Sequence, residues 1–139
     1  MTSTRPILVV DDDIDHAVIL RTVLASVAPE APVEMCTDPS RLPGVLLEAP
    51  EGAVVLIDRL LRGVESFPHL KVARDERPDL YVVLLSSALS PEDRARVLQS
   101  GARDAAEKPG SLSLWRSMLG KMLTDADERD AQRGDARAG

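Results

Sequence analysis

Carboxylate, hydroxyl and ammonium side chains stand at four separate places in the sequence, at or shortly after the ends of strand-like segments. They are Asp11 with Asp12, then Asp58, Ser86 and Lys108. Clustered carboxylates repel one another unless a cation lies among them, and Mg²⁺ is a small cation that prefers oxygen ligands. Such an ion neutralises a phosphoryl group during transfer to a carboxylate, while a lysine and a hydroxyl hold its remaining oxygens. Together these residue types predict a phosphoaspartate site.

Each residue type also has an ordinary structural interpretation when it is taken alone. The acidic run at residues 11–13 is typical of a helix N-terminus, where the helix dipole favours negative charge. Ser86 by itself is a hydroxyl at a strand end, and Lys108 by itself is a solvated charge. Asp58 differs, because a charge directly after five apolar residues must be compensated. The combination favours the functional interpretation.

The elements that position these residues follow from hydrophobic periodicity. Unbroken apolar runs at 7–10, 53–57 and 80–85 predict strands that are buried on both faces. Weaker strands are expected at 32–37 and 102–107. Helices are expected at 13–27, from 38 onward, and at 66–76, 90–101 and 112–123. Strand and helix alternate five times, which predicts a parallel sheet covered on both faces. Ligands of such sheets bind beyond the carboxyl ends of the strands, so the polar residues should meet at one edge.

Composition limits the classes of protein to consider. The chain has 139 residues and a formal net charge of −6, with 44% hydrophobic and 2% aromatic residues. These values predict one domain whose core is built from Val, Leu, Ile and Ala. The negative charge argues against non-specific binding to nucleic acid or to an anionic membrane. No signal peptide or membrane-length apolar run is recognisable, so we expect a soluble cytoplasmic protein.

The two ends of the chain differ in character. We expect the domain to occupy residues 1–124, followed by a disordered or frayed tail over residues 125–139. From Asp125 onward no apolar side chain is larger than alanine, so this segment has little with which to join a core. The one cysteine, Cys36, rules out an intrachain disulfide and is interpreted as a small buried apolar residue.

Over residues 6 to about 124 the sequence resembles the receiver domain of two-component response regulators. The matching pieces are residues 7–13, the strand 54–58 with Gly63 beyond it, Ser86, the segment 101–104, and Lys108 with Pro109. The resemblance implies an α/β fold of the flavodoxin-like, doubly wound (βα)5 type. Its five-stranded parallel sheet would have the order 2-1-3-4-5. The resemblance also implies a cis peptide bond between Lys108 and Pro109.

The same resemblance assigns roles to the polar residues. Asp58 would be the phosphoacceptor, and Lys108 would contact the phosphoryl group and couple to the hydroxyl of Ser86. The protein ligands of the implied Mg²⁺ would be Asp11, Asp12, Asp58 and the backbone carbonyl of Leu60. The chain would not be an enzyme beyond self-catalysed phosphorylation and dephosphorylation.

Partners follow from the same family. A sensor histidine kinase or a histidine phosphotransfer protein would supply the phosphoryl group, and a further protein would read the result. The sequence leaves no room for an output domain after Leu123, so we expect a stand-alone receiver that acts through protein–protein contacts. We expect a monomer or weak homodimer with no nucleic-acid or membrane partner.

Three departures from the family pattern keep alternatives open. Arg59 directly follows Asp58, Arg62 stands where the family usually has proline, and Ala105 replaces a switch Tyr or Phe. A methyl group cannot act as that switch, which favours a phosphorylation-independent interaction module as the first alternative. The second is a magnesium-dependent phosphohydrolase, which generally needs a second carboxylate soon after its nucleophile. Here Arg59 and Leu60 occupy those places.

Three further residues are assigned to ordinary positions. His16 and His69 are interpreted as surface or rim residues, not as phosphohistidines. Trp115, in the last expected helix, belongs either to the core or to a face shared with the preceding helix, and the core is favoured.

Overall fold

The computed structural model describes residues 3–138, and it describes side chains for residues 3–129. The main sheet contains β1 (Ile7–Val10), β2 (Val33–Cys36), β3 (Val54–Asp58), β6 (Tyr81–Ser86) and β7 (Asp104–Glu107). The helices are α1 (Ile14–Val27), α2 (Leu42–Glu48), α3 (Phe67–Glu76), α4 (Pro91–Gln99) and α5 (Leu112–Ala138). Two short strands, β4 (Leu60–Leu61) and β5 (Val64–Glu65), form a hairpin, and a 3₁₀ helix, η1 (Pro39–Arg41), precedes α2.

The five main strands are all parallel and lie in the order β2-β1-β3-β6-β7. This is the predicted order 2-1-3-4-5, because β4 and β5 belong to the separate hairpin and only shift the numbering. Asp58, the last residue of β3, pairs in register with Leu85 of β6. The predicted doubly wound α/β fold is therefore confirmed.

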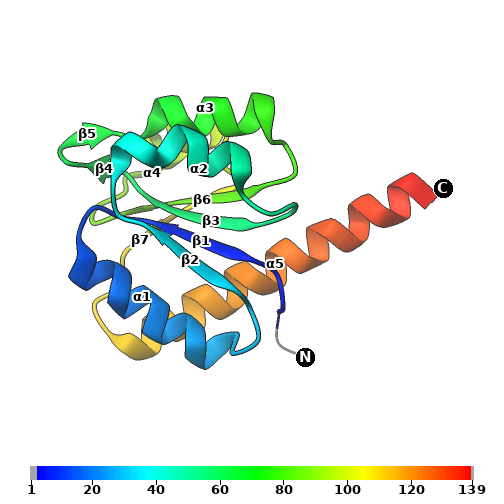
Figure 1. Ribbon diagram of the computed structural model, residues 1–139, viewed down its shortest axis with the longest axis horizontal. Coiled ribbons are helices and arrows are strands. Elements are labelled where there is room, and N and C mark those ends of the chain that lie inside the picture. The colour runs from blue at the N-terminus through cyan, green and yellow to red at the C-terminus, as the bar shows by residue number, and fades with distance from the viewer. Residues whose placement is uncertain (1–2, 139) are drawn as a thin grey trace.

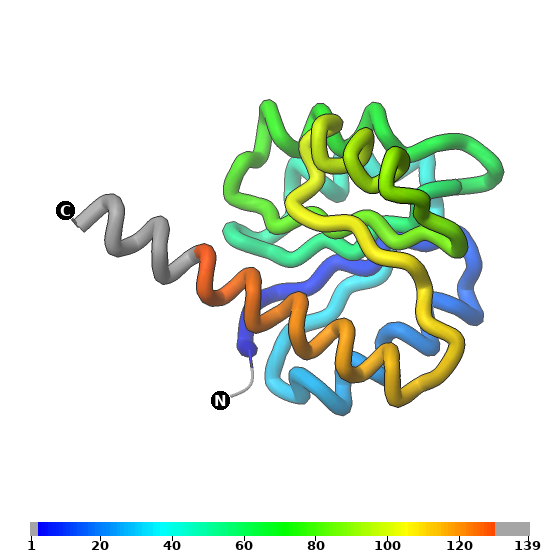
Figure 2. The backbone as a smooth tube through the Cα atoms, turned by 180° about the vertical axis from the view of Figure 1, so that it is seen from behind, coloured from blue at the N-terminus to red at the C-terminus, as the bar shows by residue number. Residues whose placement is uncertain are grey.

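Helices cover both faces of the sheet, with α2, α3 and α4 on one side and α1 and α5 on the other (Figures 1 and 2). Alternate residues of each strand serve the two layers, because successive side chains point to opposite faces. The first layer includes Leu8, Val10, Leu42, Leu70 and Val97. The second includes Ile7, Val9, Leu20, Trp115 and Leu119. Each fully buried side chain of this size stabilises the fold by roughly 1.5–3 kcal/mol.

Local signals set the starts of the helices. Asp13 caps α1 by accepting a hydrogen bond from the backbone N–H of His16. Ser90 caps α4 in the same way, through the N–H of Asp93, and Pro91 occupies the first helical position. Both are side-chain caps of the kind that satisfy exposed N–H groups at a helix start. The predicted starts of these helices are therefore close to those observed.

Helix α5 is longer than predicted. It was expected to end near Leu123 and to be followed by a disordered or frayed tail, but it continues through Ala138. Ala126 is buried, and Asp127 forms an ion pair with Arg5 at 3.1 Å. The guanidinium of Arg129 lies 5.5 Å from the ring centre of Tyr81. A small side chain and charged groups thus pack this stretch without large apolar residues, and the tail prediction is wrong for residues 125–129. The side chains of 130–138 and all of residue 139 lie outside the described part.

Within residues 3–138 no helix combines the length and the hydropathy that a bilayer crossing would need.

An arginine–aspartate pair ties three elements together at the edge of the sheet far from Asp58. Arg77 directly follows α3 and donates to Asp79 through Nε at 3.0 Å and Nη2 at 2.9 Å. Its Nη1 also donates to the carbonyls of Leu46 and Leu47 at the end of α2. The N–H of Gly52, just before β3, donates to Asp79 at 2.9 Å. Hydrogen bonding from Arg77 lowers the pKa of Asp79 from 3.8 to about 2.

This pair predicts a specific loss of stability in acid. Because the folded state holds the pKa of Asp79 below its unfolded value, the carboxylate stabilises the fold above pH 3.8, and that contribution disappears as the pH falls through about 2. We expect the native protein to lose about 2 kcal/mol through this group. Asp79→Asn should remove that part of the pH dependence in urea unfolding between pH 7 and pH 2.5.

Asp75→Asn is the matched control, because Asp75 pairs with Arg74 at the surface, where its side chain is 64% exposed. Exposed pairs of this kind contribute little. An unchanged acid slope in Asp79→Asn, or an equal change in Asp75→Asn, would contradict the assignment.

Candidate functional site

Three carboxylates meet at the carboxyl edge of the sheet, as predicted. Asp11 and Asp12 follow β1 and Asp58 ends β3, and the carboxylate oxygens of the three lie within 4.8 Å of one another. Asp11 is buried, with 2% of its surface exposed, while Asp12 and Asp58 are half-buried. The neighbouring parallel strands β1 and β3 bring these residues together although they are far apart in the sequence.

Lys108 supplies a positive charge to this cluster. Its Nζ donates to Asp58 Oδ2 at 3.2 Å, and both side chains are largely shielded from water. Burial raises the pKa of the Asp58 carboxyl; the charge of Asp11 raises it as well, while the ammonium of Lys108 lowers it. The net effect is a raised pKa. The carboxylate of Asp58 is thus short of compensating positive charge even with Lys108 in place.

Backbone contacts hold Lys108 in position. Its N–H donates to the carbonyl of Ser86 at 2.8 Å, directly after the paired ends of β6 and β7. The peptide bond between Lys108 and Pro109 is trans, since residues 3–138 contain no cis peptide bond. The cis bond implied by the resemblance is therefore wrong for this structure. The trans form is the intrinsically preferred isomer before proline, and Lys108 reaches Asp58 with it.

Ser86 lies at the same edge but uses its hydroxyl locally. It ends β6, is 5% exposed, and its Oγ donates to the carbonyl of Ala88 at 2.7 Å. A buried hydroxyl needs such a partner. The hydrogen bond between Lys108 and Ser86 joins backbone groups only. Coupling of Lys108 to the Ser86 hydroxyl, and contact of that hydroxyl with a phosphoryl group, stay predictions.

His16 belongs to the site, which sequence reasoning missed by treating it as a surface or rim residue. Its Nδ1 forms a hydrogen bond with Asp11 Oδ2. The other carboxylate oxygen of Asp11 accepts the N–H of Asp13 at 3.0 Å. Burial raises the pKa of Asp11, but these hydrogen bonds, together with nearby positive charge, outweigh it and the net pKa is lowered. The available signal was the position of His16 in the first turn of α1, from which a side chain can reach back to the strand end.

His69 was interpreted as a surface or rim residue, and its side chain is partly exposed. It lies near the start of α3, is half-buried, and its pKa is lowered by burial. The two histidines therefore have different surroundings, although the sequence treats them alike.

The hairpin of β4 and β5 explains one departure from the family pattern. Its turn residues Arg62 and Gly63 have φ angles of 51° and 77°, the two positive values that tight hairpin turns require. The N–H of Arg62 donates to Asp12 Oδ2 at 3.1 Å. Proline fixes φ near −65° and has no N–H, so it fits neither requirement at this position. Leu60 begins β4, and the role of its carbonyl as an ion ligand stays a prediction.

Arg59, another departure from the family pattern, forms ion pairs with two neighbouring carboxylates. Its Nε lies 3.2 Å from Glu65 of β5, and its Nη1 lies 3.3 Å from Asp93 of α4. Its guanidinium also lies 5.7 Å from the ring centre of Phe67. Arg59 therefore connects the hairpin to α4 beside the acidic cluster.

At the third departure, the small side chain of Ala105 is packed within the core. It is 1% exposed in β7. Arg94 of α4 donates to its carbonyl through Nη1 at 2.6 Å and to Asp104 through Nη2 at 2.7 Å. Arg94 thus ties α4 to β7 beside Ala105. Trp115 is core, as favoured, at 5% exposure against α1.

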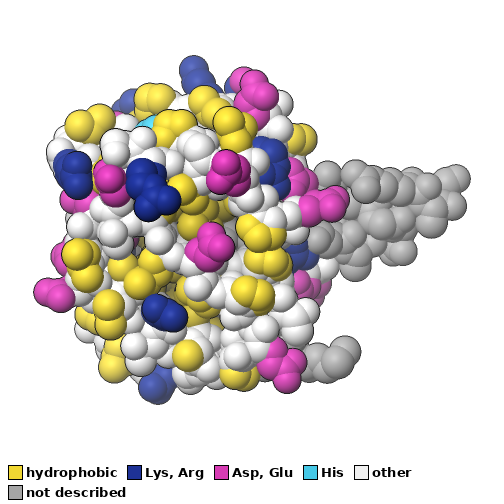
Figure 3. Space-filling model, viewed as in Figure 1, with side chains coloured by type: hydrophobic (Ala, Val, Ile, Leu, Met, Phe, Trp, Pro, Cys, Tyr) yellow, Lys and Arg dark blue, Asp and Glu magenta, His cyan; other side chains and the backbone are white. Residues whose placement is uncertain are grey.

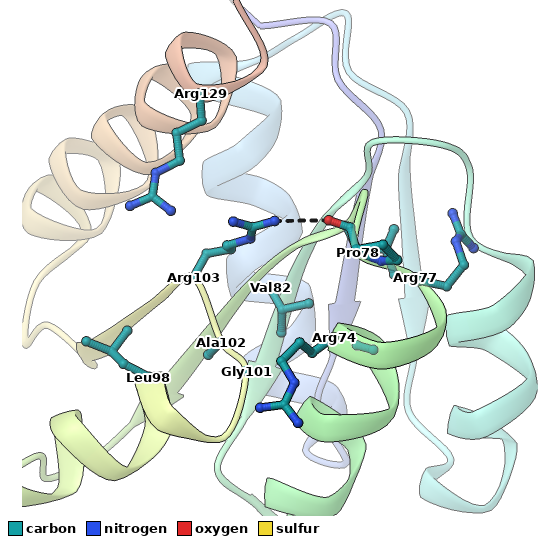
Figure 4. Close-up of a pocket in the computed structure, with 11 residues that line it drawn as sticks. Arg74, Arg77, Pro78, Val82, Leu98, Gly101, Ala102, Arg103 and Arg129 are labelled. Atoms are coloured by element: carbon teal, nitrogen blue, oxygen red, sulfur yellow. Dashed lines mark hydrogen bonds between the residues drawn. The ribbon is translucent and has the colours of Figure 1, made fainter. Parts of the chain in front are cut away.

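The opposite edge of the sheet has a hollow of about 330 Å³ whose lining includes four arginines (Figure 4). Arg103 donates to the carbonyl of Pro78 at 3.0 Å, and Arg74 donates to the carbonyl of Gln99 at 3.3 Å. Arg77 points away from the hollow toward its partners in α2. Arg74, Arg77 and Arg103 thus bind backbone carbonyls around the hollow, while Arg129 lies against the ring of Tyr81. Elsewhere, on the face in Figure 3, charges of both signs are interspersed with apolar side chains.

The residues of the acidic cluster fit a magnesium ion. Three carboxylates from two adjacent strand ends supply hard oxygen ligands of the kind Mg²⁺ prefers. The charge of Asp11 raises the pKa of Asp58, which an added cation would reverse. A carboxylate beside such an ion and a lysine can act as a nucleophile toward phosphorus.

Solved structures of similar fold are described as response regulators or their receiver domains. A response regulator receiver domain protein (CheY-like) from Methanospirillum hungatei JF-1 has a TM-score of 0.77 at 23% identity, covering 94% of this chain and 99% of that chain. The signal receiver domain of the DNA-binding response regulator merR from Colwellia psychrerythraea 34H has a TM-score of 0.72 at 21% identity, and the match covers 86% of this chain and 98% of that chain. A response regulator from Thermotoga maritima has a TM-score of 0.72 at 21% identity, and the match covers 88% of this chain and 99% of that chain. No protein-family model and no curated protein matches the sequence.

Proposed function

We propose, on the premise that this chain has the fold of response-regulator receiver domains, that it is a single-domain response regulator phosphorylated on Asp58. The observation that carries the proposal is the position of Asp58. It ends a central strand among two further carboxylates and is paired with Lys108 at 3.2 Å. A helical cover on both faces leaves this strand edge as the place where a phosphodonor meets the chain.

In the proposed reaction a carboxylate oxygen of Asp58 attacks the phosphorus of a phosphohistidine. The new O–P bond replaces the N–P bond, and the released imidazole takes up a proton. Asp11, Asp12, Asp58 and the carbonyl of Leu60 would hold a Mg²⁺ ion. That ion would neutralise charge on the phosphoryl oxygens. Lys108 would shift from Asp58 to a phosphoryl oxygen, and Ser86 would donate to another after leaving Ala88.

The proposed partners are a sensor histidine kinase or histidine phosphotransfer protein and a downstream protein that reads the phosphorylated surface. We place the exchange in the cytoplasm. The chain acts as a signalling domain and turns over only its own phosphoryl group, as a monomer or weak homodimer.

The test is intact-mass measurement of the purified chain after incubation with acetyl phosphate and Mg²⁺. We expect the gain of one phosphoryl group, its absence when EDTA removes the ion, and its loss on treatment with hydroxylamine, which cleaves acyl phosphates. A gain that survives hydroxylamine would place the phosphate on another residue. No gain with any donor or divalent ion would favour the second candidate, an interaction module that does not use phosphorylation. The core packing of Ala105 in place of an aromatic is the observation that favours it.

A further inference from the structure

The carboxylate of Asp11 is held from two sides. Its Oδ1 accepts the N–H of Asp13, and its Oδ2 is bound by Nδ1 of His16. With 2% of its surface exposed, Asp11 has little water to replace either partner. Its orientation toward Asp12 and Asp58 therefore depends on these two contacts, of which only the one from His16 comes from a side chain.

The same histidine ring also touches α5. The rings of His16 and Trp115 lie edge to face, with centres 5.5 Å apart and planes at 60°. The His16 side chain is 19% exposed and Trp115 is 5% exposed, so both rings are held in packed surroundings. One side chain thus bridges the acidic cluster and the helix that covers this face of the sheet.

We propose that His16 is a positioning residue for the magnesium site, which orients Asp11 and connects occupancy of the site to α5 through Trp115. The inference rests on the proposed function, since it assumes an ion among these carboxylates. Side chains that hydrogen-bond a metal ligand hold it in its binding orientation, and their removal typically costs about 10- to 100-fold in affinity. The contact with Trp115 offers a route from the site that does not pass through Ala105.

The role of His16 in Mg²⁺ binding is tested by titrating the full chain with Mg²⁺ at one fixed pH and following backbone amide shifts by NMR. We expect His16→Ala to bind Mg²⁺ about 10- to 100-fold more weakly than the native protein. His16→Asn should recover most of the affinity, because its amide nitrogen can occupy the place of Nδ1. His69→Ala, on the other face of the sheet, is the control and should bind as the native protein does. Equal affinity in His16→Ala would overturn the inference.

The connection to α5 is tested by fluorescence, since Trp115 is the one tryptophan of the chain. Mg²⁺ should change its emission in the native protein and in His69→Ala. His16→Asn should bind the ion with a much smaller emission change, because the ring that contacts Trp115 is gone. An emission change of native size in His16→Asn would refute the connection.

The outcomes separate this inference from the proposed function. If the native chain binds Mg²⁺ and gains a phosphoryl group while His16→Ala binds the ion equally well, only the role of His16 fails. If the native chain binds no Mg²⁺, both fail. Circular dichroism and thermal unfolding without the ion establish that each variant is folded before it is titrated.

Discussion

Asp58→Asn is expected to abolish the acetyl-phosphate-dependent mass gain of this chain. The substitution keeps the shape of the side chain but removes the anionic oxygen that attacks phosphorus. It also removes one of the three carboxylates that lie within 4.8 Å of one another. Both effects act in the same direction, so intact-mass measurement after incubation with acetyl phosphate and Mg²⁺ should detect no phosphorylated species.

Asp13→Asn is the matched control for this experiment. Asp13 belongs to the same acidic run as Asp11, but its side chain caps α1 by accepting the N–H of His16. Asparagine is as good a cap as aspartate, and the backbone N–H that donates to Asp11 is unchanged. Asp13→Asn should therefore be phosphorylated as the native protein is. Phosphorylation of Asp58→Asn at the native rate would show that Asp58 is not the acceptor.

The loss in Asp58→Asn should not come from unfolding. Because burial raises the pKa of Asp58 in the folded state, its ionisation lowers the stability of the fold as the pH rises from 3.8 through the folded pKa. The neutral amide lacks this penalty. In EDTA at pH 7 the variant should melt at the same temperature as the native protein or above it. A marked fall in melting temperature would mean that the pair with Lys108 outweighs the cost of burial.

Gly101→Ala is expected to destabilise the fold by about 3 kcal/mol. Gly101 lies between α4 and β7 with φ of 119°, a backbone conformation that side chains disfavour. A Cβ atom there would lie 2.8 Å from the carbonyl oxygen of Leu70 and 2.8 Å from Cβ of Arg74. Neither neighbour is the end of a flexible side chain, so α3 must move away from α4. Urea unfolding at pH 7 measures the change.

Gly44→Ala is the control that separates this clash from the general effect of adding a methyl group. Gly44 lies inside α2, and a Cβ atom there would meet nothing within 4 Å. Alanine is favoured over glycine within helices, so we expect a gain of about 0.5–1 kcal/mol. Equal and small effects at both positions would contradict the close approach of α3 to Gly101.

The polar residues of the site were predictable because they depend on strand ends. An apolar run predicts a buried strand, a polar residue marks its end, and parallel strands bring their carboxyl ends to one edge. Asp11, Asp12 and Asp58 gather there for this reason, and the sheet also places Lys108 beside Asp58. Helix starts were similarly readable at Asp13 and Ser90, because a cap acts within one turn of the chain.

The amino-acid sequence by itself determined the alternation of elements, the order of the sheet through its resemblance, and the set of polar residues at the carboxyl edge of the sheet. Only the tertiary structure decided how His16 lies between Asp11 and Trp115, why Arg62 occupies a turn closed to proline, and how Arg5 and Tyr81 hold the continuation of α5. The physical reason is distance along the chain. Periodicity and caps act over a few residues. The contacts of His16 with Trp115, of Arg62 with Asp12 and of Arg5 with Asp127 instead join segments that meet only after the sheet and its covering helices have packed.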